Sequence, residues 1–93
     1  MNKKKLLKAR SKIDLIDNKI FNLIVKRTRI VKYMLSLKTQ KKHIVDRKRM
    51  NQIFKNIKSK SIKKNIDHKI TLQIWKSMIW SYIDFQKRKF KRK

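Results

Sequence analysis

Three basic side chains and one amide lie where an apolar residue or a helix end is expected, and they are the residues best suited to chemistry. Arg27 interrupts an apolar seam, and Lys38 follows eleven residues later on the same face. Gln86 continues an apolar stripe near the end of the chain. Arg49 lies between Lys38 and Gln86 in the sequence. Guanidinium groups bind carboxylates as a fork, and an ammonium or amide donates to an oxygen that gains charge. The set therefore suits a small dianion.

Each of these residues also has a purely structural interpretation. The stem of Arg27 can extend outward to place its charge in water, and Lys38 can complement the dipole at a helix C-terminus. Arg49 follows Asp46 by three residues, which favours a local pair. No nucleophile or acid–base pair accompanies the set, so any reaction would depend on positioning and electrostatics.

Several kinds of chemistry are excluded by what the sequence lacks. With no Cys, disulfides, thiol nucleophiles and zinc fingers are excluded, and the isolated His43 and His68 are too few for a typical metal site. Gly and Pro are also absent, and phosphate-binding loops, dinucleotide-binding turns and nucleophile elbows need glycine. We therefore expect no cofactor and no metal.

The charge of the chain is extreme: 30 Lys and Arg stand against 5 acids, all Asp, which gives a net charge of +25. Such a chain binds nucleic acid non-specifically at low salt, so the charge says little about function. Hydrophobic residues make up 40%, which favours a folded protein over a basic tail. The start lacks the apolar region of a secretory signal, and no stretch approaches the roughly 20 apolar residues of a membrane span. We expect a cytoplasmic protein without membrane contact.

The elements that position these residues are predicted to be helices alone, an all-α fold. A seam with alternating spacings of three and four predicts one helix over about residues 4–38. The seam consists of Leu6, Ala9, Ile13, Ile16, Ile20, Leu23, Arg27, Ile30, Met34 and Leu37. Such a helix spans roughly 52 Å, whereas a compact chain of this size is about 32 Å across. Because the seam must be covered, we expect a second copy of the chain, most simply in a twofold dimer.

Two further helices complete the predicted three-helix protomer, which we expect to form a single domain over residues 1–93. A loop over residues 38–43 precedes a short second helix that Asp46 caps, and residues 58–65 form a connection. Asn65 or Asp67 caps the third helix, and we expect basic residues 1–5 and 87–93 to be frayed. The buried face of the second helix is predicted as Met50, Ile53, Phe54 and Ile57. The stripe of the third helix is predicted as Ile66, Ile70, Ile74, Trp75, Met78, Ile79, Tyr82, Ile83 and Gln86.

The segment RSKIDLIDNKIFNLIVKR, residues 10–27, resembles the first-helix signature of the AroQ-class, all-helical chorismate mutases. The remaining features follow in the same order. Lys38 closes the helix, Asp46 and Arg49 match the family's Asp-x-x-Arg pattern, and an aliphatic and Trp pattern leads to Gln86. The likeness covers about residues 6–86 and is specific in the first helix but loose in the third.

The resemblance implies an intertwined homodimer that rearranges chorismate to prephenate without a cofactor, in aromatic amino acid biosynthesis. Arg10 and Arg27 would hold the two substrate carboxylates. Lys38 and Gln86 would be catalytic, donating to the ether oxygen as its negative charge grows. Asp46 and Arg49 would line the ring and hydroxyl side.

The spacing of Arg10 and Arg27 agrees independently with a dimer. Seventeen residues of one helix separate them by roughly 25 Å, and their directions differ by about 100°. One chain therefore cannot hold one small molecule with both, and Arg10 would come from the other subunit. A surface pair between Arg10 and Asp14, one turn later, is the alternative.

Two positions depart from the family pattern. Met50 stands where the family usually has a glutamate that contacts the substrate hydroxyl, so that contact is lost. Tyr82 stands where the family usually has a small residue, often Ser, so the pocket is narrower or gains a phenol donor. We hypothesise lower activity than is usual in the family. The amide of Gln86 does not titrate, so we expect a rate nearly flat across neutral pH.

Other functions remain open at this point. Isochorismate-pyruvate lyases resemble the mutases in fold and site, and these motifs do not separate the two. A small basic nucleic-acid-binding protein would explain the charge, with Trp75 and Trp80 able to stack on bases, but it gives no reason for Arg27 and Gln86 on apolar stripes. A membrane-surface helix is less favoured because the charge is scattered around every face.

Overall fold

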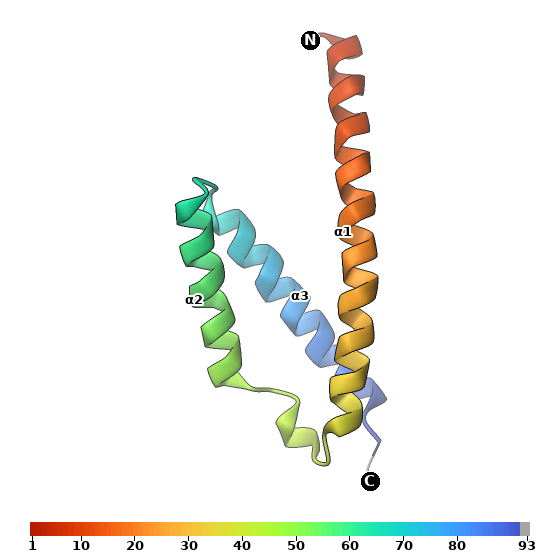
Figure 1. Cartoon of the computed structure of the whole chain (residues 1–93), viewed down its shortest axis with the longest axis vertical. Helices are drawn as coiled ribbons and strands as arrows, with labels where there is room; N and C mark the ends of the chain where they lie inside the picture. Colours follow the sequence, from red (N-terminus) through yellow and green to blue (C-terminus); the bar gives the residue numbers. More distant parts are fainter. Residues whose placement is uncertain (92–93) are drawn as a thin grey trace. The chain divides into compact units, whose positions relative to one another are not determined.

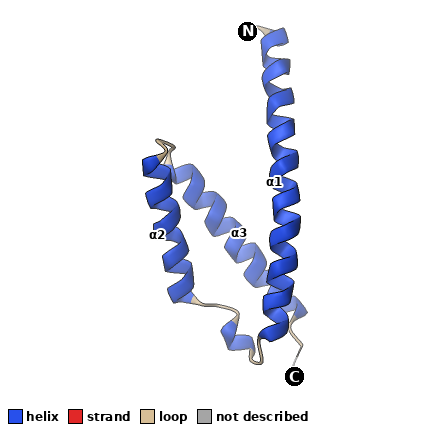
Figure 2. Cartoon of the chain, in the orientation of Figure 1, coloured by secondary structure: helices blue, strands red, loops and turns tan. Residues whose placement is uncertain are grey.

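The computed structural model describes residues 1–91 and contains three α-helices joined by short connections (Figure 1). Helix α1 covers Lys3–Leu37, the 3₁₀ turn η1 covers Lys41–His43, α2 covers Arg47–Lys63 and α3 covers His68–Lys89. No strand occurs in residues 1–91 (Figure 2), which confirms the all-α fold. The chain divides into two compact units, residues 1–32 and residues 33–93.

The first unit is the uninterrupted greater part of α1, as the seam predicted. Asn2 Oδ1 accepts a hydrogen bond from the backbone N–H of Lys5 over 3.0 Å, and this contact orders the first turn. Residues 3–5, expected in a frayed tail, are therefore helical. Most of the seam is solvent-exposed in the single chain; Ile16, at its centre, is 54% exposed.

The second unit is built on α2 and α3, which run in opposite directions from the turn between them and pack together (Figure 1). Its core contains Ile44 from the segment before α2, Met50 from α2, and Ile79 and Ile83 from α3. Leu35, from the last turn of α1, packs against this cluster. The predicted inner faces of the second and third helices are confirmed around this core, while Ile66, Ile70 and Ile74 at the start of the third stripe are exposed.

The connection predicted over residues 58–65 is wrong, because α2 continues to Lys63. The reason is the burial of Ser61, whose hydroxyl lies 2.6 Å from that of Thr71 in α3 and also donates to the carbonyl of Ile57. Asn65 then takes a positive φ of 55°, a conformation that Asn tolerates at a helix end. Asp67 caps α3 by accepting from the N–H of Lys69.

The C-terminal end of α3 extends further than expected. Residues 87–89, predicted to be frayed, belong to the helix, where three basic side chains complement its dipole. Arg88 Nε also pairs with Asp84 Oδ2 over 2.9 Å. The final part of the predicted frayed tail, residues 92–93, lies outside the described residues.

Candidate active site

A hydrogen bond between a cation and an amide lies at the centre of the candidate site. Lys38 Nζ donates to Gln86 Oε1 over 2.7 Å, and forty-eight positions separate the two residues in sequence. Lys38 directly follows α1 and is half-buried, whereas Gln86 in α3 is buried, with 7% of its surface exposed. The structure thus brings together the two residues for which the resemblance implied a catalytic role.

The amide of Gln86 is held at both ends. Its oxygen accepts from Lys38, and its Nε2 donates to the backbone carbonyl of Tyr82 over 3.2 Å, one turn earlier in α3. This contact fixes which end of the amide faces Lys38. A primary amide carries two N–H donors and an ammonium carries three, and the two bonds use one donor of each group. The pair therefore has the chemical capacity to donate jointly to an additional oxygen.

The ammonium of Lys38 has a perturbed acidity. Burial lowers the pKa of Lys38 below its usual value, and the negative charge of Asp46 acts in the opposite direction by raising it. The net direction is down. The two residues belong to different segments, since Lys38 follows α1 and Asp46 precedes α2.

Asp46 and Arg49 have a local structural relationship at the start of α2. Asp46 is the N-cap residue, and its Oδ1 accepts from the backbone N–H of Arg49 over 3.0 Å. The contact between Asp46 and Arg49 that their spacing of three residues predicted therefore involves the backbone N–H of Arg49. The Arg49 side chain is exposed and borders a shallow depression on α2 together with Gln52, Lys55, Asn56 and Ser59.

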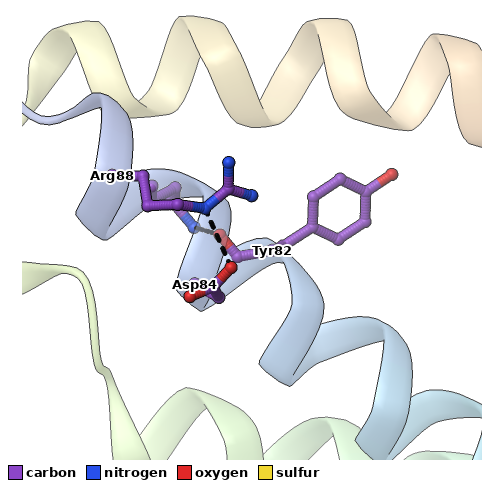
Figure 3. Close-up of polar contacts among 4 residues, drawn as sticks. Tyr82, Asp84 and Arg88 are labelled. Atoms are coloured by element: carbon purple, nitrogen blue, oxygen red, sulfur yellow. Dashed lines mark hydrogen bonds and ion pairs between the residues drawn. The ribbon is translucent and has the colours of Figure 1, made fainter.

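The two positions that depart from the family pattern have different surroundings. Met50 is buried in the core with Ile44, Ile79 and Ile83. Tyr82 is half-buried on α3, and Figure 3 shows its ring extending away from the Asp84–Arg88 pair. That pair was not predicted from the sequence, although its i,i+4 spacing could have indicated the contact.

The remaining candidates, Arg10 and Arg27, belong to the first unit. Both lie on the continuous helix α1, Arg10 exposed and Arg27 half-buried. They remain seventeen residues apart on a straight helical segment, so the separation of roughly 25 Å derived from the sequence applies. The hydrogen bond from Gln86 to the Tyr82 carbonyl was also not predicted from the sequence, although the i,i+4 spacing could have indicated it.

Residues 1–91 contain neither a metal-binding cluster nor a helix able to span a membrane. No group of three or more His, Cys, Asp or Glu side chains is arranged there to hold a metal ion. Within the same residues, no helix combines the length and the hydropathy that a membrane crossing requires.

The sequence pattern of chorismate mutase type II matches residues 9–87. Because the match covers most of the chain, this protein belongs to the type II chorismate mutase family, a family of isomerases. No curated protein and no solved structure matches the chain.

Proposed function

We propose that this protein converts chorismate to prephenate, acting in the cytoplasm as a homodimer in which residues 1–93 form one catalytic domain. In this rearrangement the ether C–O bond breaks while a C–C bond forms, and no atom is gained or lost. The reaction needs a substrate held in its reactive conformation and donors for the ether oxygen. The observation that carries the proposal is the 2.7 Å bond between Lys38 Nζ and Gln86 Oε1 in a chain of this family.

The proposed roles follow the family pattern residue by residue. Lys38 and Gln86 donate to the ether oxygen, while Arg27 and the partner subunit's Arg10 each hold a carboxylate. Asp46 and Arg49 line the ring and hydroxyl side. Two supports come from the described residues: the amide of Gln86 is already oriented by the Tyr82 carbonyl, and Lys38 is already directed at it.

Met50 and Tyr82 are proposed to border the substrate as the family's equivalents do. Met50 supplies a thioether in place of a carboxylate and therefore gives the substrate hydroxyl no strong acceptor. Tyr82 narrows the space one turn before Gln86. Both changes support the hypothesis that turnover is lower than is usual in the family.

The homodimer is supported by the apolar surface that the single chain leaves in water. Along α1, Ile13, Ile16, Ile20 and Leu23 are all about half exposed or more. On α3, Ile70 and Ile74 are also exposed, one turn apart. Exposed apolar side chains repeated along a helix are characteristic of an interface. Because a dimer brings a second copy of Arg10, it also supplies the second carboxylate ligand that one chain cannot provide.

The decisive test is the loss of chorismate with product identification. Purified protein is compared with the Arg27→Ala variant at moderate salt, which suppresses non-specific anion binding. Arg29→Ala is the matched control, since it removes the same charge from an exposed position on the same helix. We expect prephenate from the wild type and the control, and a large loss with Arg27→Ala.

The other outcomes of this test identify the alternatives. Pyruvate released from isochorismate, with chorismate unchanged, would identify a lyase on the same scaffold. No turnover of either compound, together with tight and salt-sensitive nucleic-acid binding that Arg27→Ala leaves unchanged, would assign the protein to nucleic-acid binding and overturn the proposal.

A further inference from the structure

The Lys38 side chain must remain an ammonium to donate to a developing oxyanion, but its surroundings oppose that charge. It is half-buried, and its hydrogen-bond partner Gln86 is neutral. Resting on the proposed function, we propose that Asp46 is the counter-charge of Lys38: besides capping α2, it faces the end of α1 across the C-terminal half of α3 and so acts as a positioning residue for the reaction.

The packing of the second unit brings Asp46 to the same end of α3 as Lys38. Ile44 and Met50, which flank Asp46 in sequence, are both buried in the core against α3 residues, among them Ile83. Gln86 lies three residues after Ile83, on the same face of the helix, and holds Lys38. The start of α2 and the end of α1 therefore meet at the C-terminal half of α3.

The carboxylate of Asp46 is fixed at the start of α2. Its Oδ1 accepts from the N–H of Arg49, which locks the side chain at the helix start. The carboxylate also lies at the positive end of the α2 dipole, where an acidic side chain stabilises the helix. An ionised carboxylate offers two acceptor oxygens, so the cap contact leaves further acceptor capacity.

The other acids of the second unit are engaged elsewhere. Asp84 pairs with Arg88 over 2.9 Å, and Asp67 caps the opposite, N-terminal end of α3. The last turn of α1 carries no charged residue. Tyr82, one turn before Gln86 in α3, is a titratable group without charge at neutral pH, and the other charged or titratable residues of the neighbouring turns are all bases. They are Lys41, Lys42 and His43 of η1, Arg47, Lys48 and Arg49 of α2, and Lys87, Arg88 and Lys89 of α3.

The acidity of Lys38 agrees with this arrangement. Burial lowers the pKa of Lys38, and the charge that raises it is that of Asp46. Removal of that charge leaves burial unopposed, so Lys38 would lose its proton at a lower pH.

The test uses two variants that make the same chemical change at two helix caps. Asp46→Asn removes the charge and retains a good cap, because Asn caps helices about as well as Asp. Asp67→Asn makes the same change at the start of α3, away from Lys38, and is the matched control. Asp46→Ser supplies a second neutral cap if Asp46→Asn folds poorly.

The first readout is the titration of Lys38 in the full chain, followed by NMR of isotope-labelled lysine side chains. The Lys38 signal is assigned by its loss in Lys38→Arg. We expect the Lys38 midpoint to move to lower pH in Asp46→Asn and to stay in place in Asp67→Asn. A midpoint unchanged by Asp46→Asn, or moved equally by both variants, would overturn the proposal. This readout does not depend on catalysis.

The second readout is the pH profile of kcat/KM for chorismate. We expect the alkaline limb to move to lower pH in Asp46→Asn in step with the NMR midpoint, an effect that loss of a structural cap would not produce. A shifted midpoint with an unshifted alkaline limb would overturn the positioning role. If the wild type turns over no chorismate, the proposed function fails, and the NMR titration still decides whether Asp46 is the counter-charge.

Discussion

Lys38 Nζ and Gln86 Oε1 lie 2.7 Å apart, so the ammonium that follows α1 is joined to the buried amide of α3. Neither residue has an obvious structural need for the other, since a lysine at a helix end is normally solvated and a core glutamine can bond to its own helix. Their pairing places an ammonium and a non-titrating amide at one point, which is the arrangement required to stabilise a growing negative charge on oxygen.

Removal of the ammonium is predicted to abolish most of the activity. Lys38→Ala should lower kcat about 10²–10³-fold, the usual effect of losing one donor to a developing oxyanion. Steady-state kinetics on chorismate measures this, and Lys42→Ala, an exposed lysine of η1, is the control. If both variants lose activity equally, Lys38 contributes only to the general positive potential.

The pH dependence of the wild type follows from the groups at the site. Gln86 does not titrate, and Lys38 donates only when protonated, so activity is complete below the pKa of Lys38 and is lost as pH rises through it. Because burial lowers that pKa, the loss should begin at a lower pH than for a fully solvated lysine. A profile of kcat against pH should therefore be flat across neutrality and fall on the alkaline side. A steep rise toward acid would contradict this assignment.

Restoration of the family's carboxylate at position 50 should raise turnover or substrate affinity per folded molecule. The gain has a structural cost, because Met50 is only 7% exposed in a core of isoleucines and a buried carboxylate is destabilising. Met50→Glu is therefore compared with Met50→Leu by kinetics and by denaturant unfolding. Unchanged turnover and affinity in the folded Met50→Glu protein would refute the hypothesis that Met50 reduces activity.

A charge introduced into the α1 seam should dissociate the proposed dimer. Ile16→Glu places a carboxylate at an apolar position that is 54% exposed in the single chain. Asn18→Glu, on the opposite side of the same helix, introduces the same charge and is the control. Sedimentation equilibrium should show a monomer for Ile16→Glu and a dimer for the control. The monomeric variant should also be less active, since Arg10 of one subunit then no longer reaches the site of the other subunit.

The core of the second unit should be sensitive to truncation. Ile83 is 5% exposed and packs with Ile44, Met50 and Ile79, so Ile83→Ala should lower the free energy of unfolding by about 2–4 kcal/mol. Chemical denaturation followed by circular dichroism gives the value. A loss below about 1 kcal/mol, the range of surface substitutions, would show that this cluster is not the stabilising core.

Local features of the fold could be predicted well from the sequence. The seam predicted a helix over residues 4–38, and the structure has Lys3–Leu37. Asp46 and Asp67 cap the following helices, both named as candidates from their residue type. The end of α2 was missed because the polar run over residues 58–65 has no apolar periodicity. That run is helical because Ser61 is buried and bonded to Thr71, a contact between helices that no local pattern contains.

The sequence by itself determined that the chain is helical and which residues could do chemistry. Without Gly and Pro it has few ways to turn, and its apolar periodicity shows which positions face a core. Only the tertiary structure decided that Lys38 and Gln86 share a hydrogen bond and that Ile44, Met50 and Ile83 form one core. The physical reason is that periodicity specifies directions around one helix, whereas contacts between side chains distant in sequence depend on how the helices pack.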